Sequence, residues 1–167
     1  MLPRKMVIVG LLYCWIRTGV ARCQSKALFP AARRTKRAAD EPMNPTFHSS
    51  FSDVHLLFEI LMAGIQFDSS GAFSVKDAEL ASLRKTKNLD VICEEIIPKK
   101  ITDIFRLISD LSNYACRLRQ EDFERTLLTL VYAAQQVAGS SSEHQRDAWA
   151  QSFVQLYKAI KKDLTTE

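Results

Sequence analysis

The chain has 167 residues, of which 47% are hydrophobic and 25% are charged, with 23 Lys and Arg against 19 Asp and Glu. Nine of the basic residues and none of the acidic ones precede Ala38, so the remainder carries 23 − 9 = 14 basic and 19 acidic residues, or −5. An acidic body argues against binding to a phosphate backbone, so we expect no nucleic-acid partner.

The first 21 residues have the pattern of a signal peptide. Arg4 and Lys5 precede an apolar run over residues 6–16, and Gly19-Val20-Ala21 supplies small residues before a cut after Ala21. Eleven apolar residues span roughly 16 Å as a helix, about half a bilayer, which argues against a stable membrane anchor. A signal anchor, favoured by Arg17, or a buried first helix are the alternatives. The pattern predicts a secreted protein.

Residues 22–37 form a flexible, basic pro-segment in this interpretation. It ends in Arg34-Thr35-Lys36-Arg37, the type of cluster that secretory-pathway convertases cleave after the last arginine. The alternative is a short heparin-binding or nuclear-import patch. Behind a signal peptide, we expect cleavage after Arg37 by a convertase.

Two cysteines, Cys93 and Cys116, remain after both cuts, and we treat them as a candidate disulfide. The closed loop would stabilise the fold by about 3 kcal/mol in the chain-entropy model. Two free buried thiols, or a bond from Cys23 to one of the pair, are the alternatives left open.

After an extended lead-in over residues 38–52, helical periodicity predicts an all-α domain over 53–164, a compact bundle of about five or six helices. Ser50 or Ser52 caps the first helix, which ends near Phe67 with a stripe of Val54, Leu57, Phe58, Leu61 and Ile65. A turn and a short extended piece over 72–75 follow. Ser74 or Asp77 then opens a helix that passes Leu83, and Asn88 opens another that Pro98 stops.

Three further helices complete the expected domain. Thr102 caps one of them, and a loop over 112–119 follows. The next runs from Glu121 to Gly139, with a stripe of Phe123, Leu127, Leu130, Val131 and Ala134. Ser142 opens the last helix, whose apolar positions are Trp149, Phe153, Leu156, Ile160 and Leu164.

Residues with catalytic potential do not form a recognisable arrangement. The three histidines are scattered and none has the spacing of a zinc ligand, while Cys93 lies on an apolar helix face. Glu121, Asp122 and Glu124 are explained by a solvated first turn, where the helix dipole favours ionised carboxylates. We therefore expect no catalytic residue, metal or cofactor, and no enzyme.

Four strings identify a resemblance to a known family. Residues 28–32 (LFPAA), 76–85 (KDAELASLRK), 121–126 (EDFERT) and 148–152 (AWAQS) closely resemble the vertebrate proteins called "family with sequence similarity 180". The resemblance implies a small secreted protein and assigns no activity, ligand or catalytic residue.

Two functions follow as expectations. The first is a secreted helical interaction protein, a ligand for a receptor or another extracellular protein, matured by cleavage after Arg37. The alternative is a small extracellular or lumenal enzyme or carrier whose site comes from residues distant in sequence. An exposed apolar patch on a solid core favours the first, and a cavity with converging polar groups favours the second.

Overall fold

The computed structural model describes residues 28–29, 46–47, 49–68, 70–114 and 117–165. Within them the chain forms α2 (Phe51–Ala63), β1 (Ile65–Phe67), β2 (Phe73–Val75), α3 (Ala78–Ser82), α4 (Thr86–Val91), the π-helical turn η1 (Ile92–Ile96), α5 (Ile101–Ser112), α6 (Gln120–Gly139) and α7 (Glu143–Thr165). The fold is mostly α-helical, as predicted from the sequence.

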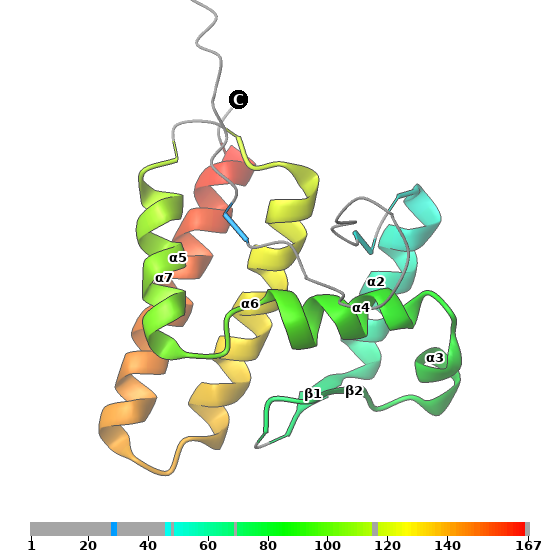
Figure 1. Ribbon diagram of the computed structural model, residues 1–167, viewed down its shortest axis with the longest axis horizontal. Coiled ribbons are helices and arrows are strands. Elements are labelled where there is room, and N and C mark those ends of the chain that lie inside the picture. Colours follow the sequence, from blue (N-terminus) through cyan, green and yellow to red (C-terminus); the bar gives the residue numbers. More distant parts are fainter. Residues whose placement is uncertain (1–27, 30–45, 48, 69, 115–116, 166–167) are drawn as a thin grey trace, which may run out of the picture.

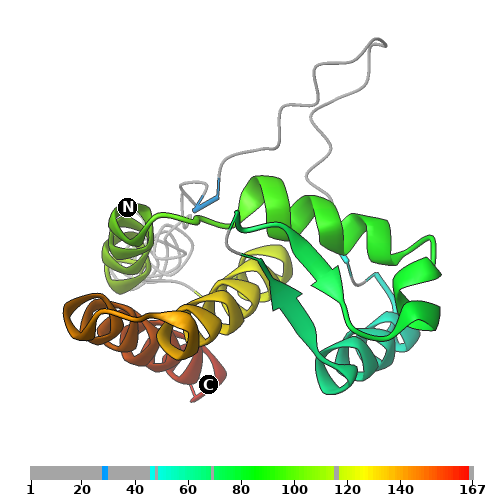
Figure 2. The same cartoon turned by 90° about the horizontal axis from the view of Figure 1, so that it is seen from below.

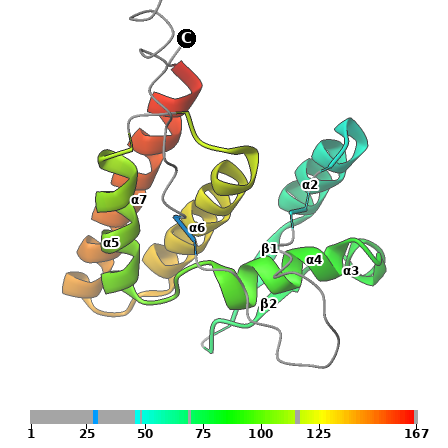
Figure 3. The same ribbon diagram turned by 45° about the horizontal axis from the view of Figure 1, so that its top comes forward.

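The three longer C-terminal helices α5, α6 and α7 pack side by side (Figure 1). The hairpin β1–β2, α3 and α4 lie on the other side of α6, and α2 stands at the periphery, away from α5 and α7 (Figures 1 and 3). The main core comprises side chains from α4, η1 and the three C-terminal helices, including Leu89, Ile92, Ile104, Leu128 and Leu156, each with 0% exposure. The helix α6 therefore lies between α5 and α7 on one side and the elements that precede α5 on the other.

The first helix ends four residues earlier than its periodicity predicts. Gly64 follows it with φ +102, a conformation that favours glycine, and donates its N–H to the Ile60 carbonyl. Ile65, expected on the helical stripe, begins the strand β1, which pairs antiparallel with β2 in the register Ile65 to Val75. The expected extended piece over 72–75 corresponds to β2.

Two of the predicted helix starts lie too late in the sequence. Asp77 caps α3 through a bond from the Leu80 N–H, as expected. The next helix begins at Thr86 and not after Asn88, and α5 begins at Ile101, one residue before its predicted cap, Thr102. The helix before Pro98 ends in a π-helical turn, with a 3.0 Å bond from the Ile97 N–H to the Ile92 carbonyl.

Two residues from the N-terminal segments belong to the core. Phe29, which the sequence places in the pro-segment, is 2% exposed, and Phe47, in the lead-in, is 0% exposed. Residues 28–29, drawn in blue in Figure 1, lie beside α6. The folded body thus includes side chains that the sequence analysis placed outside the helical domain.

Candidate functional site: an exposed apolar helix face

The clearest unusual surface is one side of α2. Phe51, Val54, Phe58 and Met62 follow one another at spacings of three and four residues and share one side of the helix. They are 78%, 46%, 61% and 71% exposed, whereas Leu57 and Ile60 on the opposite side are buried. We call these four residues the α2 outer face. A helix that is apolar all round is normally buried on all sides.

The α2 outer face is about as large as the largest apolar patch on a typical single chain. Taking about 200 Å² for a large apolar side chain, the four exposed fractions correspond to roughly 500 Å². A contiguous apolar patch of about this size commonly marks a site of interaction with another molecule. The ring of His55 packs against the Phe51 ring at 4.7 Å between centroids and extends the same surface.

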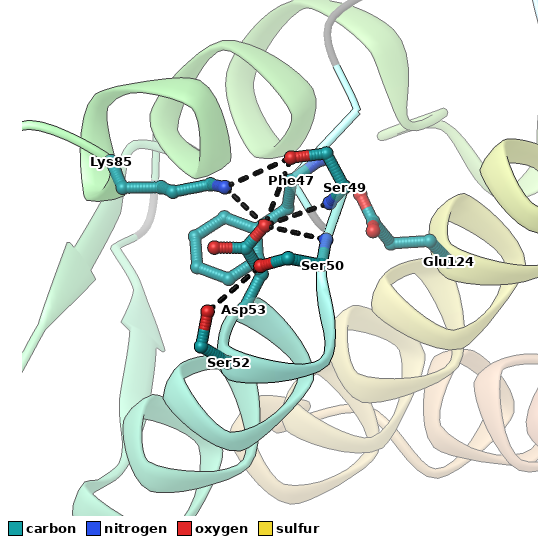
Figure 4. A network of polar contacts seen from close by, with 7 residues as sticks. All are labelled: Phe47, Ser49, Ser50, Ser52, Asp53, Lys85 and Glu124. Atoms are coloured by element: carbon teal, nitrogen blue, oxygen red, sulfur yellow. Dashed lines mark hydrogen bonds and ion pairs between the residues drawn. The ribbon is translucent and has the colours of Figure 1, made fainter.

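The start of α2 is fixed by a network around Asp53 (Figure 4). One carboxylate oxygen of Asp53 accepts the backbone N–H groups of Ser49 and Ser50 at 2.8 and 2.9 Å, and it pairs with the Lys85 ammonium. The Lys85 contact and these backbone bonds hold the pKa of Asp53 well below its usual range. The network joins α2 to the N-cap of α4, so the outer face is held in a defined orientation.

A second anchor connects the segment before α2 to α6. The Phe47 N–H donates to Oε1 of Glu124 at 2.8 Å, and both residues are buried (Figure 4). The Phe47 ring also lies under the Lys85 ammonium, 6.0 Å from its centroid. Glu124 and Lys85 therefore secure the lead-in from two sides.

The expectation of a solvated first turn for Glu121, Asp122 and Glu124 is wrong for two of the three. Asp122 is 6% and Glu124 is 1% exposed, and Arg125 beside them is 1% exposed. Burial, followed by the charge of Glu121, raises the pKa of Asp122. The predicted apolar stripe of α6 is only half-buried, because α6 has neighbours on several sides and its polar side faces the lead-in.

The small hairpin is held at both outer edges by side chains. Gln135 of α6 accepts the Phe67 N–H at 3.0 Å and donates to the Ile65 carbonyl at 2.6 Å, as a neighbouring strand would. On the other edge, Glu94 accepts the Phe73 N–H at 3.3 Å. These bonds attach the hairpin, which follows α2 in the chain, to α6 and η1.

Lys99 clamps the turn of the hairpin onto α6. Its ammonium donates to the Gly71 carbonyl at 2.9 Å and lies 4.2 and 4.6 Å from the ring centroids of Phe67 and Tyr132. Partial burial lowers the pKa of Lys99. Two aromatic faces and a carbonyl satisfy this cation within the fold.

An open groove of about 1150 Å³ lies between the hairpin and the junction of α6 with α7. Figure 2 shows the backbone of these elements from below. The lining of the groove combines polar side chains, including Gln66, Gln136, Ser140, His144 and Gln145, with apolar ones such as Trp149. Gln135, also in the lining, uses both ends of its amide to bind β1. The groove is the feature that would suit a carrier.

The processing residues predicted from the sequence, Ala21, Arg34, Lys36 and Arg37, lie outside the described residues. So does Cys116, one half of the candidate disulfide. Cys93 is a buried thiol on η1, and burial raises its pKa well above the usual range, as expected of a core cysteine. Its bond to Cys116 stays a prediction.

The structure describes no group of three or more His, Cys, Asp or Glu side chains, among the residues it places, that could hold a metal ion. Within the same ranges, no helix is both long and apolar enough to cross a bilayer.

Sequence reasoning missed the α2 outer face because Val54 and Phe58 were assigned to the buried stripe. Both are exposed, whereas Leu57 of the predicted stripe is buried as expected and Ile60, outside the stripe, also faces the core. A signal was present, because a 13-residue helix with Phe51, Phe58 and Met62 in addition to its inner residues has more apolar positions than one side needs.

The described residues form a small, mostly α-helical protein in which one side of α2 is apolar and exposed. A profile of the FAM180 family matches residues 28–164, and the chain belongs to this family. Protein FAM180B from Homo sapiens is 28% identical over 111 residues, which cover 65% of this chain and 61% of that relative. The match thus spans less than two thirds of the relative's length. No solved structure matches the chain.

Proposed function

We propose that this protein is a secreted, non-enzymatic interaction protein that is matured by cleavage after Arg37 and binds a partner protein through the α2 outer face. The observation that carries the proposal is the exposure of Phe51, Phe58 and Met62 on one helix, whose N-terminus is anchored through Asp53. Burying roughly 500 Å² of apolar surface would stabilise a complex by about 12 kcal/mol before the costs of association.

The charges around the α2 outer face indicate the chemistry of the partner. The helix α2 has two acidic residues, Asp53 and Glu59. Asp53 is buried and paired with Lys85, so Glu59 is the exposed acidic residue of the helix. The chain from Ala38 onward has a formal charge of −5. An apolar groove with lysine or arginine at its rim complements this surface, in the way that a groove receives one side of a helix.

The binding site is tested by replacing Phe58 with aspartate. A benzophenone side chain at position 55 of the secreted protein is irradiated on intact cultured cells, and cross-linked proteins are identified by mass spectrometry. Because a charge would have to be buried in the apolar contact, we expect Phe58→Asp to reduce recovery of the partner at least tenfold. Circular dichroism should be unchanged, since Phe58 is 61% exposed.

Leu164→Asp on α7 is the matched control, because Leu164 is 62% exposed and lies outside the proposed surface. We expect this variant to cross-link as well as the wild type. Equal recovery from both variants would contradict a role for the α2 outer face, and cross-links found only between two copies of this chain would replace the proposed partner by a dimer.

Maturation is tested by mass spectrometry of conditioned medium from cells that express the full chain. The expected product begins at Ala38, and Arg37→Ala should abolish it because convertases require the last basic residue of the cluster. Recovery of only a product that begins at Arg22, with residues 34–37 intact, would eliminate the maturation step.

A further inference from the structure

The body contains a socket that is filled by residues from the predicted pro-segment. Phe29 is 2% exposed and belongs to the main core, and Leu28 packs against that core while half-buried. The Phe29 ring centroid lies 6.0 Å from the guanidinium carbon of Arg125, which is itself 1% exposed. A cation at this distance favours an electron-rich aromatic ring in the socket.

The region that matches the FAM180 family begins at Leu28, so it includes the two residues that fill the socket. These residues precede Arg37, whereas Arg125 follows it in the sequence. Cleavage after Arg37 would therefore separate the inserted residues from the socket covalently. Cleavage at this site in cells is part of the proposed function, on which the inference below rests.

Leu28 and Phe29 can occupy the socket through so small a contact because they are covalently connected to the body. A tethered group acts at an effective concentration of about millimolar, whereas a peptide released outside the cell is diluted far below that. In the part of this contact that the structure describes, one buried aromatic and one half-buried aliphatic side chain cover far less than the roughly 800 Å² per partner of a standard stable interface. The peptide should thus leave the socket once the chain is cut.

We propose that Leu28 and Phe29 are an internal ligand that closes this socket in the precursor. Cleavage after Arg37 opens it, and the mature protein binds a peptide segment of a partner that carries an aromatic side chain beside an aliphatic one. The socket is a second contact point for the partner, and processing controls access to it.

The test uses the full secreted chain with a recognition site for a sequence-specific protease inserted between Arg37 and Ala38. After cutting, gel filtration at about 1 µM should separate the N-terminal peptide from the body, whose helical circular dichroism stays unchanged. A fluorescent synthetic peptide of residues 24–33 should then bind the cut protein at micromolar concentration and should not bind the uncut precursor.

The same peptide with Phe29→Ala is the control and should bind at least tenfold more weakly, because the buried ring is the main contact. Co-elution of the native peptide with the body, loss of helical structure on its release, or equal binding of the two peptides would each overturn the proposal. Since the cut is engineered, these outcomes are independent of whether cells cleave after Arg37.

Discussion

Replacing Glu124 with alanine is expected to lower the free energy of unfolding by about 3 kcal/mol. The carboxylate accepts the N–H of Phe47 across 77 residues of sequence, and both groups are buried. The alanine variant leaves that N–H in a buried site without its acceptor, which costs more than the net value of the bond. Urea denaturation followed by circular dichroism measures the change. Glu124→Gln, which keeps an oxygen acceptor, should lose less stability.

Glu121→Ala is the matched control on the same helix turn. Glu121 is partly exposed, and its pair with the exposed Arg119 at 3.5 Å is of a kind that contributes less than about 1 kcal/mol. Equal losses for Glu121→Ala and Glu124→Ala would contradict the view that Glu124 anchors the lead-in.

Replacing Phe47 with alanine should destabilise the protein by about 3–5 kcal/mol. Its side chain is 0% exposed, so the substitution removes a buried ring and leaves a cavity between the lead-in and the body. Thermal unfolding of the two proteins compares their stabilities. The variant should melt at a temperature well below that of the wild type.

Phe51→Ala provides the comparison four residues further along the chain. Phe51 is 78% exposed, so the same substitution should change the free energy of unfolding by no more than about 0.5 kcal/mol. A large loss for Phe51→Ala would mean that the α2 outer face packs within the fold and is not available to a partner.

The helical class of the fold could be predicted from sequence, because apolar spacing reports which residues share a side of a helix. Apolar spacing could not, however, predict which side of α6 is buried. There the buried residues include Glu124, Arg125, Thr126 and Thr129, and a pattern that counts only apolar side chains places these in solvent. The partner that makes burial of Glu124 favourable is a backbone N–H in the lead-in, which no local window contains.

The α2 outer face could not be predicted because its apolar residues are exposed, whereas on α6 polar residues are buried. Periodicity identifies an apolar side of a helix on the assumption that it faces the core, and α2 has apolar residues on both sides. Only the fold shows that Ile60 points inward while Phe58 is exposed. The periodicity also extends the predicted helix past Gly64, because Ile65 continues the helical spacing. The positive φ of Gly64, which ends the helix, is a property of the folded backbone.

The side-chain bonds of Gln135 and Glu94 along the two outer edges of the hairpin limit how this protein can associate. A strand edge with free N–H and carbonyl groups invites a foreign strand, which is a common route both to recognition and to aggregation. Here one amide and one carboxylate occupy positions that an incoming strand would need. A strand of another molecule would have to displace these two side chains before it could pair with the described hairpin. We therefore expect partners to bind to helix surfaces, where the shape of the surface and not main-chain pairing selects the partner.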